Sequence, residues 1–134
     1  MSPLNVQDAS LNQSKALPAA GASASTTGID LGPAQDFLAT VEFEVAVPAT
    51  PALVETKTII VDIQTDNDVA FGSPKTIIDN IITVTGQAAA AGGAAASERF
   101  RVPTNVERYL RATATVLAAG GDNTAVSFTL KPCF

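Results

Sequence analysis

The stretch TIIVDIQTDNDVAF at residues 58–71 decides how this chain folds. Ile59, Val61 and Ile63 fall on one face of the segment and mostly polar residues fall on the other, which is the period of two expected of a half-buried β-strand. The run TDND then ends the strand, because short Asx side chains hydrogen-bond their own backbone and favour turns. Phe71 is the first large apolar residue after the turn, and we expect it to fold back under the sheet.

Further strand-like segments lie on both sides of this one. Their alternation predicts strands at residues 41–47, 76–85, 98–103, 108–117 and 124–130, with a short extended segment at 25–32. About eight short strands without a convincing helix predict an all-β sandwich or barrel. Two long strand connections favour a small jelly-roll or Greek-key β-sandwich with an extended N-terminal arm.

Two of these segments have unusual compositions. Residues 76–85 are β-branched and apolar on both faces, so they form either an edge strand covered by a partner or a central strand buried on both sides. Residues 87–97 are rich in Ala, but Gly92 and Gly93 divide the run into pieces too short for a stable helix. We therefore predict a flexible loop there.

The first 24 residues are small and polar, with isolated apolar residues that include Leu11 and Leu17. They form either a disordered leader or an arm that orders by docking on a neighbouring chain. We therefore divide the chain into an arm at 1–24 and a β-sandwich domain at 25–134. No apolar run reaches the roughly 20 residues of a membrane span, and the N-terminus lacks the features of a signal peptide.

The composition narrows the possible functions. The chain of 134 residues has a net charge of −5, no basic run, no His and one Cys. These features argue against nucleic-acid binding, His/Cys zinc sites and His-based catalysis. Charged residues make up 16%, against roughly 25% in typical domains, so the surface is suited to being covered by a partner.

Acidic residues offer the one candidate cation site, at Asp62, Asp66, Asp68 and Asp79. The cluster lacks the remaining ligands and the glycine spacing of an EF-hand loop, so an Asx-rich turn explains it better. No catalytic constellation, metal site or cofactor motif is recognisable, and we expect a protein that is not an enzyme.

Four of the eight Lys and Arg residues are arginines between positions 99 and 111. We expect Arg99, Arg101, Arg108 and Arg111 on the outward faces of two strands joined by a turn. They form either a solvated basic face or a docking patch for an acidic protein surface, since arginine binds carboxylates through two hydrogen bonds.

Three strings in the sequence resemble a known family. They are IQTDNDxAFxSP at residues 63–74, RYLR at 108–111 followed by an alternating Ala/Thr strand, and TxxIDLG at 26–32, where x marks a position that does not contribute to the resemblance. Together they resemble the phage capsid cement proteins of the Bbp16-like family, over about residues 25–131. The longer N-terminal leader and the Ala/Gly insertion at 88–96 depart from the family pattern.

The resemblance implies a jelly-roll protein, made in the host cytoplasm, that decorates the outer surface of a virion. It implies a homo-oligomer, dimer or trimer, that bridges neighbouring major capsid subunits, with no catalytic residues and no cofactor. The candidate capsid or subunit contacts are Leu11, Leu17, Arg99, Arg101, Arg108 and Arg111. The alternative is a carbohydrate- or receptor-binding β-sandwich module of a phage tail or fibre, against which the sparse aromatic residues argue.

Overall fold

The computed structural model describes residues 12–31 and 42–133, and these ranges contain β-strands and no helix. The strands are β1 (Gln13–Ala16), β2 (Ser23–Ser25), β3 (Ile29–Asp30), β4 (Glu42–Val47), β5 (Thr58–Asp66), β6 (Lys75–Thr85), β7 (Ala96–Arg101), β8 (Tyr109–Val116) and β9 (Ser127–Cys133). None of the described segments forms a helix long and apolar enough to cross a membrane.

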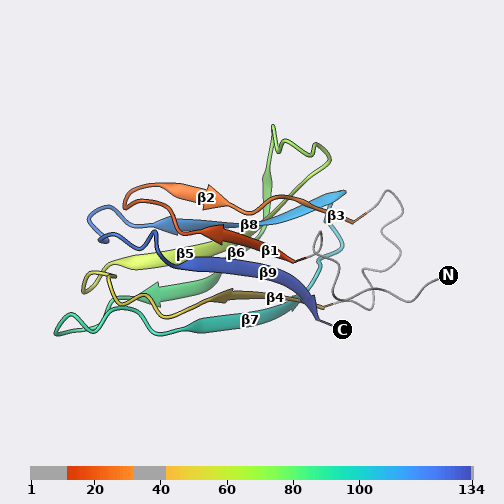
Figure 1. Ribbon diagram of the computed structural model, residues 1–134. Helices are drawn as coiled ribbons and strands as arrows, with labels where there is room; N and C mark the ends of the chain where they lie inside the picture. Colours follow the sequence, from red (N-terminus) through yellow and green to blue (C-terminus); the bar gives the residue numbers. More distant parts are fainter. Residues whose placement is uncertain (1–11, 32–41, 134) are drawn as a thin grey trace.

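The strands form two antiparallel sheets that stack as the layers of a sandwich (Figure 1). The first sheet has the order β1-β9-β4-β7, and the second has the order β2-β8-β5-β6, with β3 also paired to β8. Each sheet joins segments from distant parts of the chain, so that β1 lies beside β9 and β2 beside β8. The all-β sandwich that the sequence predicted is confirmed.

The hydrophobic core lies between the two sheets and is built from alternate residues of the long strands. Ile59, Val61 and Ile63 of β5 are all 0% exposed, as their alternation predicted. The largest fully buried side chains come from both layers: Phe43, Phe128, Leu17, Ile29, Leu53, Ile59, Ile63, Leu110, Leu130, Val45, Val47 and Val61. Val41, the first residue of the strand predicted at 41–47, lies outside the described residues.

The N-terminal boundary of the sandwich differs from the prediction. β1 pairs with β9 and β2 pairs with β8, so both lie in sheets although the arm was predicted to extend to residue 24. Leu17 is 2% exposed, and its backbone N–H donates to the carbonyl of Val126 at 2.8 Å. The prediction that Leu17 is an external contact is therefore wrong, because Leu17 belongs to this chain's own core. Leu11 lies outside the described residues.

In the described part of the chain β6 is an edge strand, so the alternative of a central strand buried on both faces is wrong for residues 76–85. It pairs with β5 and lies at the end of the second sheet. The pairing shifts register opposite Val61–Ile63, and Asn80 has a φ of 54°, which is a left-handed conformation. Ile78 and Ile81 are half-buried against the core, which accounts for the apolar residues on both faces of the strand.

The Ala/Gly run forms a loop, as predicted, but backbone hydrogen bonds hold it. Thr50 and Gly93 exchange two N–H···O bonds of 2.9 Å, and Gln87 donates to Gly92 at 2.8 Å. Gly92 has a φ of +74°, and a side chain there would collide with the backbone of Pro51. β7 follows directly and starts earlier than the predicted 98–103.

Leu17→Ala tests the place of this residue in the core. We expect the free energy of unfolding to fall by about 2–5 kcal/mol, because the substitution removes a buried side chain and leaves a cavity. Ser14→Ala on exposed β1 is the matched control and should change stability by less than about 0.5 kcal/mol. Urea denaturation measures both values. If Leu17→Ala is as stable as the wild-type protein, Leu17 lies in an external arm and not in the core.

Candidate functional site

The four predicted contact arginines do not form one patch. Arg99 and Arg101 lie on β7, at the edge of the first sheet, and their neighbour Phe100 points into the core. Arg108 precedes β8 and Arg111 lies within it, in the second sheet. A turn joins the two strands, as expected, but they belong to different layers. The arginines therefore divide between two outer surfaces of the sandwich.

The two arginines of β7 join a charged row on the outer face of the first sheet. Arg99 lies 3.7 Å from Glu44, and Arg101 lies 3.6 Å from Glu42. Lys131 on β9 approaches Glu44 from the other side at 3.6 Å. The arginine side chains are about two-thirds exposed, so each pair contributes little to stability. This arrangement fits the interpretation of a solvated, charge-balanced face.

Arg108 makes a bidentate ion pair that fixes the short strand β3 to the start of β8. Its Nε and Nη2 atoms each donate to a carboxylate oxygen of Asp30 at 3.0 Å. The guanidinium also lies over the ring of Tyr109, 5.3 Å from the ring centroid. Two parallel hydrogen bonds define orientation as well as distance, so this arginine has a structural partner within the chain.

Arg111 and Phe71 cover one another on the outer face of the second sheet. The guanidinium lies 4.2 Å from the ring centroid of Phe71, and its Nε donates to Gln64 at 2.9 Å. Phe71 is 7% exposed and closely approaches Gly28, where a Cβ atom would lie 2.6 Å from the ring. Phe71 is therefore buried, but it packs over the outside of the sheet and not in the core beneath it.

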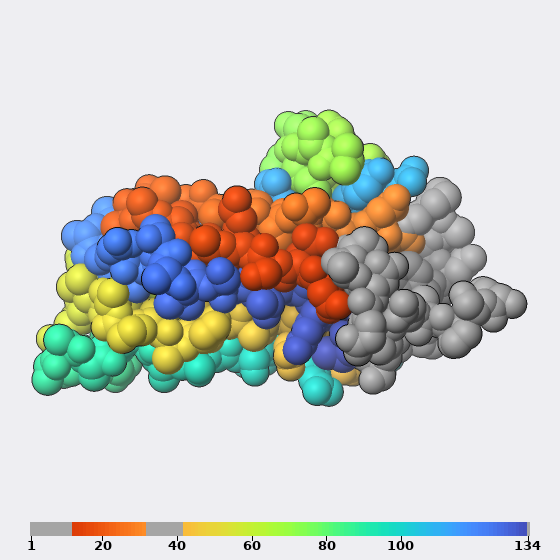
Figure 2. Space-filling model, in the orientation of Figure 1, coloured from red at the N-terminus to blue at the C-terminus, as the bar shows by residue number. Residues whose placement is uncertain are grey.

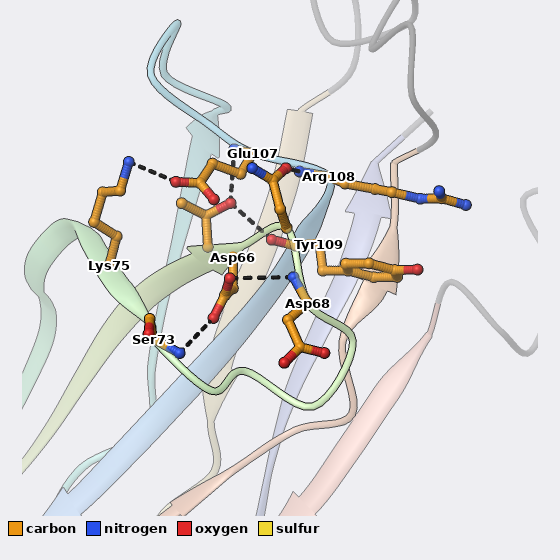
Figure 3. A network of polar contacts seen from close by, with 9 residues as sticks. Asp66, Asp68, Ser73, Lys75, Glu107, Arg108 and Tyr109 are labelled. Carbon is orange, nitrogen blue, oxygen red and sulfur yellow. Dashed lines mark hydrogen bonds and ion pairs between the residues drawn. The ribbon is translucent and has the colours of Figure 1, made fainter.

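The connection between β5 and β6, residues 67–74, is the β5–β6 loop, and acidic side chains organise its backbone (Figure 3). Asp66 accepts hydrogen bonds from the N–H groups of Asp68 at 3.1 Å and Ser73 at 2.8 Å. Asp68 accepts one from the N–H of Ala70 at 3.0 Å. These are the Asx turns that the TDND string predicted.

A second group of contacts ties this loop to the start of β8 (Figure 3). The hydroxyl of Thr65 donates to the carbonyl of Tyr109 at 2.7 Å and accepts the N–H of Glu107 at 2.8 Å. The side-chain oxygen of Asn67 accepts the N–H of Arg108 at 3.3 Å. Lys75, at the start of β6, forms an ion pair with Glu107. The loop is therefore held at both ends and has a defined shape.

The acidic cluster does not assemble as a cation site in the described part of the chain. There, no group of three or more Asp, Glu or Cys side chains is placed to hold a metal ion. Both carboxylate oxygens of Asp66 accept backbone N–H groups, which holds the pKa of Asp66 below its ordinary value, with the Ser73 N–H as the largest cause. The structure thus favours the Asx-turn interpretation over the metal site.

Asp62 on β5 and Asp79 on β6 form a separate pair at the bulge of β6. Asp62 accepts the N–H of Asn80 at 2.7 Å, which supports the left-handed residue of the bulge. Burial raises the pKa of Asp62, and the hydrogen-bonded, like-charged side chain of Asp79 raises it further. The sequence analysis grouped Asp62 and Asp79 with Asp66 and Asp68, because the bulge at which the pair lies is not visible in the periodicity.

The residues of the two strings at 63–74 and 108–111 thus meet in one assembly, although they lie more than 30 positions apart. The contacts of this assembly hold the β5–β6 loop in a defined shape. No known protein-family model matches the chain, and no curated protein matches its sequence.

Asp66→Asn tests whether the ionised carboxylate holds the β5–β6 loop. Because the pKa of Asp66 is lowered in the folded protein, its stabilisation is present above the unfolded-state value of about 3.9 and is lost as the pH falls through the lower folded-state value. We expect the variant to be less stable at pH 7, with the difference shrinking below about pH 4. Urea denaturation across this range measures it, and a pH-independent difference would contradict the role of the charge.

Asp79→Asn tests the paired carboxylates. The pKa of Asp62 is higher in the folded than in the unfolded chain, so the protonated group stabilises the folded protein at low pH. This stabilisation is lost as the pH rises through the folded-state pKa. We expect the substitution to move the pKa of Asp62 partly back toward its ordinary value, since burial remains. Carboxyl carbon-13 NMR titration of both proteins measures this shift, and an unchanged pKa of Asp62 would exclude the coupling.

Proposed function

We propose that this chain is a structural virion protein that binds the outer surface of a phage capsid and cements neighbouring major capsid subunits. One observation carries the proposal. The strings on which the family resemblance rests, at residues 63–74 and 108–111, build a rigid projecting loop and use their polar groups to hold it. A loop of fixed shape is useful for binding another protein, because little conformational freedom is lost when the contact forms.

The strand order supports the finer assignment of a jelly roll. From β4 to β9, each strand lies in the opposite layer from the one before it, except that β6 follows β5 in the same sheet, and the orders β1-β9-β4-β7 and β2-β8-β5-β6 are those that two interleaved Greek keys would produce. We therefore infer jelly-roll connectivity within the sandwich.

The surface of the second sheet also suits assembly. Away from the loop, its outer face carries cross-strand hydroxyl pairs, Ser23 with Thr115 at 2.7 Å and Ser25 with Thr113 at 2.8 Å. Uncharged groups that are already hydrogen-bonded cost less to remove from water than charged groups do. Cementing requires many modest contacts repeated by symmetry, whose avidity exceeds that of any one contact. We propose a homo-oligomer, dimer or trimer, that makes such contacts and has no catalytic role.

A carbohydrate-binding module is the weaker alternative. Stacking against sugars requires exposed rings, yet Phe43 and Phe100 stack on each other with centroids 5.9 Å apart, inside the described core. Phe128 is fully buried and Phe71 is covered by Arg111. Tyr109 is the remaining described ring and is half-buried beside Arg108.

The test is binding to phage heads. Expanded heads of the encoding phage that lack this protein should bind it, and their thermal transition should rise by several degrees when it is added. Sedimentation of heads with bound protein measures binding, and differential scanning calorimetry measures the transition. An unrelated acidic protein serves as the control. If the chain fails to co-sediment with any head preparation, the proposal is wrong, and glycan-array binding would favour the alternative.

A further inference from the structure

The β5–β6 loop carries the most exposed large apolar side chain in the described residues. Val69 is 61% exposed, whereas Val54 and Leu117, the other two exposed large apolar residues, are 43% and 46% exposed. The loop follows β5, and the green connection between β5 and β6 stands out from the body of the molecule (Figure 2). Val69 is thus an apolar group held away from the surface around it.

The backbone on both sides of Val69 is fixed. Before it, Asp66 accepts the N–H of Asp68, and after it, Asp68 accepts the N–H of Ala70 through its side chain and that of Phe71 through its carbonyl. Phe71 is in turn buried beneath Arg111. An exposed apolar group on a fixed turn is preorganised for insertion into a partner, because its position does not have to be ordered on binding.

The charge around Val69 specifies the partner further. Asp68 is its direct neighbour and is exposed, and Asp79 on β6 is also exposed. The one Lys or Arg among residues 66–79 is Lys75, at the start of β6, and it is paired with Glu107. Residues 66–79 therefore combine an exposed apolar residue with an excess of negative charge, which Arg111, lying over Phe71, balances in part. A complementary surface is an apolar pocket with a Lys or Arg side chain on its rim.

We propose that the β5–β6 loop is the anchor of this protein on the capsid, where Val69 enters an apolar pocket of a major capsid subunit and Asp68 faces a cationic side chain at its rim. This inference rests on the proposed cementing function and names the surface that performs it. Val54 lies before β5, at the end of that strand opposite the loop, about 25 Å away at 3.3 Å per residue. It provides a control of the same residue type.

The test compares Val69→Asp with Val54→Asp in binding to expanded heads that lack this protein. Both side chains are exposed, so the midpoint of urea denaturation of each variant should equal that of the wild-type protein. We expect Val69→Asp to weaken binding at least tenfold and Val54→Asp to change it less than twofold. Asp68→Asn keeps the oxygen that accepts the Ala70 N–H, and it should weaken binding and reduce its dependence on salt.

The possible failures are distinguishable. If the wild-type protein and Val69→Asp bind heads equally well, the loop is not the anchor, but the proposed cementing function is unaffected. Wild-type protein that binds no heads would overturn both. A Val69→Asp variant that binds heads normally but changes its oligomeric state in analytical ultracentrifugation would also overturn the anchor, because the loop would then be a contact between copies of this chain.

Discussion

The antiparallel pairing of β5 with β8 is the constraint on which the second sheet depends. Its register runs without interruption from Ile59 opposite Val116 to Asp66 opposite Tyr109. In the described residues, β2 and β3 join the sheet through β8, and β6 joins it through β5. The same register sets the end of β5 against the start of β8. That is why one hydroxyl, of Thr65, contacts both Glu107 and Tyr109 and holds the β5–β6 loop in place.

The long strands were predictable because their alternation reflects burial on one face. β4, β5 and β8 lie where the apolar period of two placed them, whereas β9 (Ser127–Cys133) begins and ends three residues later than the predicted 124–130, although Phe128 and Leu130 are buried as the alternation indicated. β1 and β2 were not predictable, because they are short edge strands whose exposed side chains leave no periodic signal. Leu17 therefore looked like an isolated apolar residue of an arm. Its burial depends on pairing with β9, which lies more than 100 residues away in the sequence.

The candidate site was predictable in its parts and not in its assembly. The Asx side chains at Asp66 and Asp68 predicted a turn, and local hydrogen bonds suffice to form it. The contact of that turn with the RYLR string depends on strand order, which a linear pattern does not contain. The same limit explains the arginines: Arg99 and Arg111 are close in sequence, but the chain changes sheets between them.

The edges of the two sheets restrict how this molecule can meet another protein. β1 and β2 are only four and three residues long, β7 presents Arg99 and Arg101, and β6 is bent by the bulge at Asn80. Short, charged or bulged edges resist the addition of a further strand. In the described part of the chain, the faces and loops are therefore better suited to contacts with another protein than the sheet edges are. A hydrogen-bonded loop that projects beyond the sheets would reach an opposing surface before the faces do, which is why the proposed capsid binding is assigned first to the β5–β6 loop.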